Sequence, residues 1–149
     1  MITEIQQKTS DIDWFFTSLN KIGFVVSGGG KLPDSVANLD DKLELLSAFF
    51  RGLPESSELI INSNLEAIKN TIITDNYLHD FVYMAKRGLF AFDKTVLNNF
   101  NETNYHLIAM PIKPLLTSTI PEEIFELLNN TVYTESLADF NFLDVRDVI

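Results

Sequence analysis

The residues best suited to bind an anion form the run Ser27, Gly28, Gly29, Gly30 and Lys31, directly after an apolar stretch at residues 24–26. Backbone amides of successive glycines and a lysine ammonium can together hold a phosphate or a carboxylate. The run lacks P-loop spacing, because no Ser or Thr follows the lysine and Pro33-Asp34 forms a turn where a phosphate-binding helix would begin. Two interpretations stay open: a ligand-binding loop, and a glycine-rich turn without a ligand.

Two histidines, His79 and His106, are the chain's only imidazoles and its main candidates for acid–base chemistry. Asp75 lies four residues before His79, a helical spacing at which a carboxylate can orient an imidazole. Both histidines with Asp80 would also make a metal site, although we assign none and expect no cofactor. No nucleophile lies nearby in the sequence, so His79 as an exposed helical residue and His106 as one side of a strand are the alternatives. Whether the chain is an enzyme stays open.

Glu122, Glu123 and Glu126 form an acidic cluster in the last third of the chain. Residues 115–149 hold seven acidic residues against Arg146 alone, and so carry −6 of the net charge of −10. Such a surface suits a basic protein partner, because complementary charge raises association rates and restricts orientation. Alternatively, these acids stabilise a helix N-terminus and increase solubility.

The composition narrows the class of protein. A length of 149 residues fits one domain, and 46% apolar residues with twelve Phe can build a core without crosslinks. The absence of cysteine excludes disulfides, thiolate metal sites and a cysteine nucleophile, and favours the cytoplasm. No secretory signal or membrane span is expected. Eleven basic against twenty-one acidic residues disfavour nucleic-acid binding.

The first half of the chain shows helical and strand patterns in turn. Ser10 followed by an apolar stripe at helical spacing predicts a helix that ends at Gly23; the stripe is Ile12, Phe15, Phe16 and Leu19. Residues 24–26 then predict a strand, and residues 35–51 a second helix that ends at Gly52. The rings of Trp14-Phe15-Phe16 and Phe49-Phe50 belong to the core, or leave one ring exposed as a contact patch.

The second half predicts a strand at residues 59–61 and a helical region at 65–87, either one helix or two, that ends at Gly88. Strands at 89–92 and 105–110 form an antiparallel hairpin, and Pro111 with Pro114 places the second strand at or near a sheet edge. A helix opens at Pro121. Phe140, Phe142 and Val145 indicate either a last strand or a packed tail.

These elements predict a single α+β domain over residues 1–149, with a mixed or antiparallel sheet of about four or five strands and helices mainly on one face. The functional hypothesis is a small acidic, non-catalytic protein-interaction module of the inhibitor or immunity type. An enzyme or small-ligand-binding domain with its site near the Gly28–Gly30 loop is the alternative. A structural subunit of a larger assembly is the third.

Overall fold

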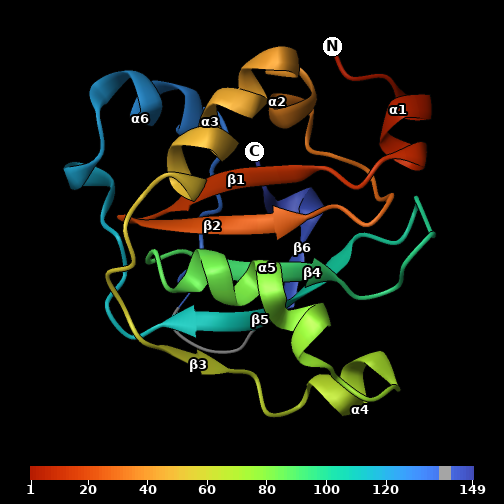
Figure 1. Ribbon diagram of the computed structural model, residues 1–149. Helices are drawn as coiled ribbons and strands as arrows, with labels where there is room; N and C mark the ends of the chain where they lie inside the picture. The colour runs from red at the N-terminus through yellow and green to blue at the C-terminus, as the bar shows by residue number, and fades with distance from the viewer. Residues whose placement is uncertain (138–141) are drawn as a thin grey trace.

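A mixed six-stranded β-sheet organises the chain in the computed structural model, which describes residues 1–137 and 142–149 (Figure 1). The strands are β1 (Asp13–Ser18), β2 (Lys21–Val26), β3 (Leu59–Ile61), β4 (Phe90–Lys94), β5 (Asn104–Pro111) and β6 (Phe142–Asp144). The α-helices are α1 (Glu4–Thr9), α2 (Asp34–Ala37), α3 (Leu43–Arg51), α4 (Leu65–Lys69), α5 (Asp75–Ala85) and α6 (Glu122–Leu128). Short 3₁₀ helices are η1 (Asp40–Lys42), η2 (Thr117–Thr119) and η3 (Val145–Asp147).

The strand order is β1-β2-β4-β5-β3, and β6 also pairs with β5. Among the strand pairs of the described residues, β2 and β4 are parallel and the other pairs are antiparallel. The predicted α+β class with a mixed sheet is therefore confirmed, with six strands where four or five were expected. Val26 at the end of β2 lies opposite Asp93 in β4, so the two parallel strands end at the same edge of the sheet.

The helix predicted from Ser10 to Gly23 is wrong, because this region forms the β1–β2 hairpin. Residues 14–18 are all buried, so the apparent helical stripe was part of a strand covered on both faces. Leu19 has φ +57° in the turn. Gly23 lies within β2 opposite Phe16, whose ring occupies the space that a Cβ on Gly23 would need.

The predicted helix at residues 35–51 is broken into α2, η1 and α3, and Asp40 between α2 and α3 has φ +51°. The segment 65–87 forms two helices, in line with one of the two alternatives. Thr74, the residue before the Asp75-Asn76 pair, caps α5 by accepting a hydrogen bond from the Tyr77 amide. Gly88 has φ +94°, which agrees with the predicted end of this helical region.

The β4–β5 hairpin is confirmed as antiparallel, and the prediction that its second strand lies at or near a sheet edge holds in its weaker form, because β5 is next to the edge strand β3. β5 pairs with β4 on one side and with both β3 and β6 on the other. Pro111 is the last residue of β5, where its missing N–H leaves the ladder intact. Helix α6 begins after Pro121, as predicted.

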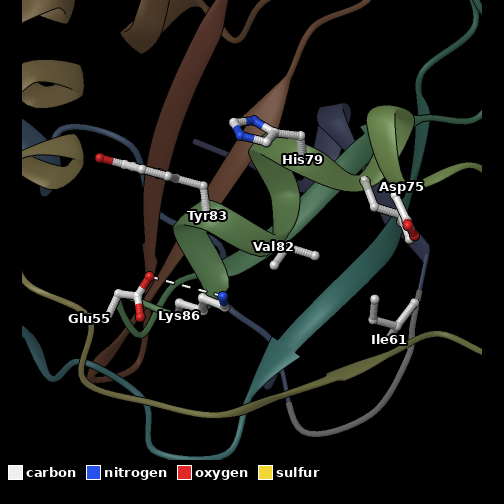
Figure 2. A pocket seen from close by; sticks show the side chains of 8 residues that line it. Glu55, Ile61, Asp75, His79, Val82, Tyr83 and Lys86 are labelled. Carbon is white, nitrogen blue, oxygen red and sulfur yellow. Dashed lines mark ion pairs between the residues drawn. The ribbon is translucent and has the colours of Figure 1, made fainter.

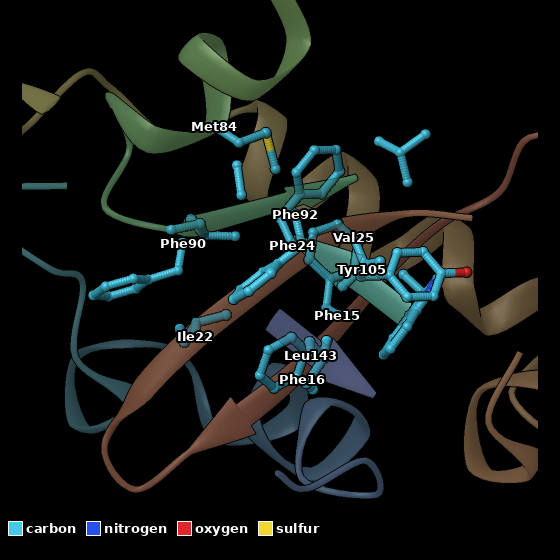
Figure 3. Packing of buried hydrophobic residues seen from close by; sticks show 14 of the residues in the cluster. Phe15, Phe16, Ile22, Phe24, Val25, Met84, Phe90, Phe92, Tyr105 and Leu143 are labelled. Atoms are coloured by element: carbon cyan, nitrogen blue, oxygen red, sulfur yellow. The ribbon is translucent and has the colours of Figure 1, made fainter. Parts of the chain in front are cut away.

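Different elements pack on the two faces of the sheet. Phe15 packs on Phe50 of α3 and Phe24 packs on Phe81 of α5, so these helices lie on one face. Phe16 contacts Tyr133 on the opposite face. Figure 3 shows Met84 of α5 over one side of the sheet, and Phe16 with Leu143 on the other.

The aromatic runs belong mainly to this core. Trp14, Phe15, Phe16 and Phe50 are fully buried, and Phe49 is half-buried. The contact-patch alternative therefore fails for these four rings, since inward-facing sheet and helix positions remove them from solvent.

The predicted last strand is present as β6, in which Phe142 is exposed and Leu143 is buried, and Val145 is buried in η3. Phe140 lies outside the described residues. Among the described residues, no helix has both the length and the apolar character that crossing a bilayer requires.

Candidate functional site

The glycine loop turns tightly after β2. Gly28 and Gly29 have φ +54° and +74°, which glycine tolerates best. The Gly28 N–H donates to Oδ1 of Asp11 at 2.8 Å, and the Gly30 N–H donates to the Ser27 carbonyl at 2.8 Å. These amides thus already have acceptors within the protein, and an anion at residues 27–31 would compete with them. Anion binding by this loop remains a prediction.

Lys94, which was not a candidate in the sequence analysis, packs so closely against the loop that position 30 must be glycine. A Cβ on Gly30 would lie 2.7 Å from Cε of Lys94 and 2.8 Å from the Tyr105 hydroxyl. Lys94 is fully buried, and its ammonium donates to the carbonyl and the carboxylate of Glu102. Lys31, by contrast, is exposed. The loop therefore packs over Lys94, which explains a glycine at position 30 without a ligand.

His79 does not pair with Asp75. Both side chains come from α5 and line one cavity of about 390 Å³. In Figure 2 they point in different directions. Nδ1 of His79 instead lies 3.4 Å from Oδ1 of Asp80, and the ring stacks on Tyr83. The predicted Asp75–His79 acid–base pair is therefore absent, while the alternative of an exposed helical histidine agrees with the structure.

His106 is buried on β5, opposite Asp93 of β4. Its Nδ1 lies 3.1 Å from the Thr95 hydroxyl, and its Nε2 has no partner in the described part of the chain. Burial, and then the charge of Lys69, lower the pKa of His106 to about 4, so the ring is neutral at neutral pH. Within residues 1–137 and 142–149, no three His, Asp or Glu side chains lie together as a metal site.

The acids predicted to meet a partner, Glu122, Glu123 and Glu126, are all exposed on α6. Glu122 and Glu123 lie in the first turn, where carboxylates favour the positive end of the helix. Glu122 also borders a cavity of about 290 Å³ next to Phe125. Both interpretations of this cluster therefore remain compatible with the structure.

A larger acidic surface lies where β2 and β4 end, and the sequence did not indicate it. Two cavities adjoin there, and Asp11, just before β1, lines both. The first, of about 530 Å³, is the acidic groove; its lining includes Ile2, Asp11, Ile12, Asp13, Asp40, Asp41, Leu43 and Glu44. The second, of about 400 Å³, is the Tyr77 cavity; its lining includes Asp11, Val26, Asn76, Tyr77, His79, Asp80, Phe81, Asp93 and Leu97.

Arg51 of α3 connects the two sides of this surface. Its guanidinium lies 2.5 Å from Oδ2 of Asp13 and 3.8 Å from Oδ1 of Asp80. Burial raises the pKa of Asp13 even so; Arg51 opposes the shift, and the charges of Asp80 and Asp11 add to it. Negative charge at Asp13 is therefore only partly compensated within the protein.

A buried polar cluster forms the floor beside the Tyr77 cavity. The Tyr77 hydroxyl donates to Oδ2 of Asp93 at 2.5 Å, and the Lys69 ammonium lies 3.4 Å from the same oxygen. Lys69 also donates to the Lys94 carbonyl at 2.7 Å, which fixes α4 to β4. Burial raises the pKa of Asp93, against the effects of Tyr77 and Lys69. The carboxylate is thus held in place by groups from α4 and α5.

The acidic groove was missed because its members come from separate segments. Asp11 precedes β1 and Asp13 is its first residue, whereas Asp40, Asp41 and Glu44 precede or begin α3. Each segment alone has an ordinary number of acids, and only the fold brings them together. The overall charge of −10 was the available signal, and it gives no location.

Comparison with known proteins adds no independent assignment. A scan of family models, a search of curated proteins and a search of solved structures each give no match. The geometry of the acidic surface is therefore the basis on which a function can be assigned.

Proposed function

We propose that this protein binds a basic protein partner through the acidic groove, and covers the partner's positive surface in the manner of an inhibitor or immunity protein. The observation that carries the proposal is the lining of the groove. It includes five carboxylates and, among the described residues, no Lys or Arg. A cavity of one sign of charge concentrates field and attracts ligands of the opposite sign.

Internal cations neutralise only part of this charge. The N-terminal ammonium of Met1 lies 2.8 Å from Asp40, and Arg51 pairs with Asp13. Asp41 and Glu44 are exposed and have no ion pair within the described chain. Basic side chains of a partner would find these two carboxylates available.

The groove also offers apolar contact. Ile2 and Ile12 are half-buried and line it beside the carboxylates. Lys and Arg side chains combine an apolar stem with a charged end, so this mixture suits them better than a purely polar surface would. Charge supplies the orientation and the rate of association, and the isoleucines supply contact area.

A matched pair of charge reversals tests the proposal. Tagged parent protein captures candidate partners from lysate of its source organism at low and moderate salt, and each candidate is purified for direct binding measurements. The groove variant Asp41→Lys/Glu44→Lys is compared with the α6 variant Glu123→Lys/Glu126→Lys, which changes the net charge equally. All four positions are exposed, so both variants should fold.

The groove variant should weaken direct binding about 30-fold, because each of the two reversed charges should cost about 1 kcal/mol of binding free energy. The α6 variant should stay within about threefold of the parent, and added salt should weaken parent binding. Failure to recover any directly binding basic protein would count against the proposal. Equal losses in the two variants would mean that total charge, not the groove, governs binding.

A further inference from the structure

The Tyr77 cavity combines the three features that a cationic side chain needs. Val26 and Leu97 provide an apolar wall, Tyr77 and Phe81 provide aromatic rings, and carboxylates come from three different elements or loops. Asp93 is the deepest of these, only 4% exposed, and is held by Tyr77 and Lys69. The cavity is therefore a built space with a fixed charged floor, in addition to its surface acids.

The charges around the cavity do not balance. Asp11, Asp80 and Asp93 line it, and Asp13 lies behind Arg51. Among the described residues, the Lys and Arg side chains within ion-pair distance of these four carboxylates are Arg51 and Lys69, and the His79 ring lies 3.4 Å from Asp80. With the acids ionised and His79 neutral, this group has a net charge of −2, so one more cation would still reduce the repulsion among the carboxylates.

The protein's own Arg51 demonstrates that such surroundings hold a guanidinium. Arg51 lies between the carboxylates of Asp13 and Asp80, and its guanidinium carbon lies 5.9 Å from the ring centre of Phe24. The Tyr77 cavity, which Asp80 also lines, has the same combination of carboxylates and rings.

We propose that the Tyr77 cavity receives the guanidinium group of an arginine side chain from the basic partner. This proposal rests on the proposed function, because it names one side chain of the same partner. The apolar wall contacts the arginine stem, Asp80 and Asp11 accept hydrogen bonds from the guanidinium, and the Tyr77 ring contacts its face.

Arginine fits this cavity better than lysine. A planar guanidinium donates to two carboxylates at once and stacks on a ring, whereas an ammonium is a compact and strongly hydrated charge. Asp11 and Asp80 line the same cavity from separate segments, so a forked donor in the cavity would have two carboxylates to bind. The cavity should therefore discriminate between two peptides of equal charge.

The test uses short peptides and needs no identified partner. Acetyl-Gly-Arg-Gly-amide and acetyl-Gly-Lys-Gly-amide are titrated into ¹⁵N-labelled protein, and amide shifts are followed by NMR. The variants are Asp80→Asn and Leu97→Lys, which alter the cavity, and Asp75→Asn, which removes an exposed carboxylate one turn earlier on α5. The groove variant Asp41→Lys/Glu44→Lys is included.

The arginine peptide should produce saturable shifts at Asn76, Tyr77, Asp80 and Leu97, with at least about threefold tighter binding than the lysine peptide. Asp80→Asn and Leu97→Lys should each weaken binding at least about fivefold, while Asp75→Asn and the groove variant keep it. Absence of saturable shifts at these residues, or equal binding of both peptides, overturns the proposal. Loss of partner binding in the groove variant without peptide shifts would leave the proposed function intact and reject only this inference.

Discussion

The Tyr77 hydroxyl and the Asp93 carboxylate, 2.5 Å apart, join the first turn of α5 to the last part of β4. Burial, followed by the charge and hydrogen bond of Asp93, raises the pKa of Tyr77, so the phenol stays protonated and remains a donor. The pair therefore holds a helix over the edge where the two parallel strands end.

Tyr77→Phe should lower the free energy of unfolding by about 1.5–3 kcal/mol, because it removes a hydrogen bond to a buried charged group. Urea denaturation followed by Trp14 fluorescence measures the change. Tyr83→Phe is the control, since its hydroxyl donates to the neutral Arg51 carbonyl at 2.6 Å and should cost about 1 kcal/mol. A smaller effect at Tyr77 than at Tyr83 would contradict the importance of the Asp93 charge.

His106 should make stability depend on pH. Its pKa is about 4 in the folded protein and 6.5 by its ordinary value. Between these pH values the unfolded chain binds more protons, so the free energy of unfolding should fall by about 3 kcal/mol as the pH decreases from 6.5 to 4. Chemical denaturation at a series of pH values gives this slope.

The variant His106→Asn should remove this contribution, whereas His79→Asn at an exposed position should retain it. Asp13 and Asp93 act in the opposite direction, since burial raises their pKa and the folded state takes up their protons first as the pH falls. The difference between parent and His106→Asn isolates the histidine. If the free energy of unfolding depends on pH in the same way in these two proteins, folding does not lower the pKa of His106.

Gly30→Ala should destabilise the protein by about 1–3 kcal/mol, because the added methyl group overlaps the buried Lys94 stem and the Tyr105 hydroxyl. Gly52→Ala is the comparison, with φ −83° and a nearest contact of 3.2 Å to the Ala48 carbonyl. Thermal unfolding of both variants measures the difference. Equal melting temperatures would mean that Lys94 can move away from the loop.

Arg51→Met should lower stability by about 1–3 kcal/mol near neutral pH, since Asp13 loses its ion pair while Asp80 and Asp11 still repel its charge. The methionine keeps an apolar stem near Phe24. Because the pKa of Asp13 is raised, acidification should protonate it and reduce the deficit. Denaturation of the parent and of Arg51→Met at neutral and mildly acidic pH measures the difference in the free energy of unfolding. A difference that grows on acidification would contradict this account.

The predictions from sequence were most accurate where the residue type itself determines the backbone conformation. Gly88 ends a helical region with φ +94°, and Pro121 precedes α6, as expected from their conformational limits. The segment from Ile12 to Leu19 was misread because a strand buried on both faces has no polar alternation to distinguish it from a helix.

The candidate site could be predicted only in part. Glu122, Glu123 and Glu126 are neighbours in the sequence and were recognised, whereas the groove depends on tertiary contacts between β1 and the region before α3. Lys94 was not recognised either, because nothing in a single sequence indicates that a lysine at a strand end will be enclosed by a loop whose Gly30 lies 64 residues earlier.

The parallel pairing of β2 with β4 constrains the order of folding. Residues 27–89 separate the two strands, so the ribosome must complete α5 before β2 can acquire its central neighbour. Closing so long a loop is slow compared with forming the β1–β2 hairpin. Until β4 and the later segments are made, Phe16 lacks its contacts with Phe92 and Tyr133, and nascent chains that stop before β4 should associate with one another or require a chaperone.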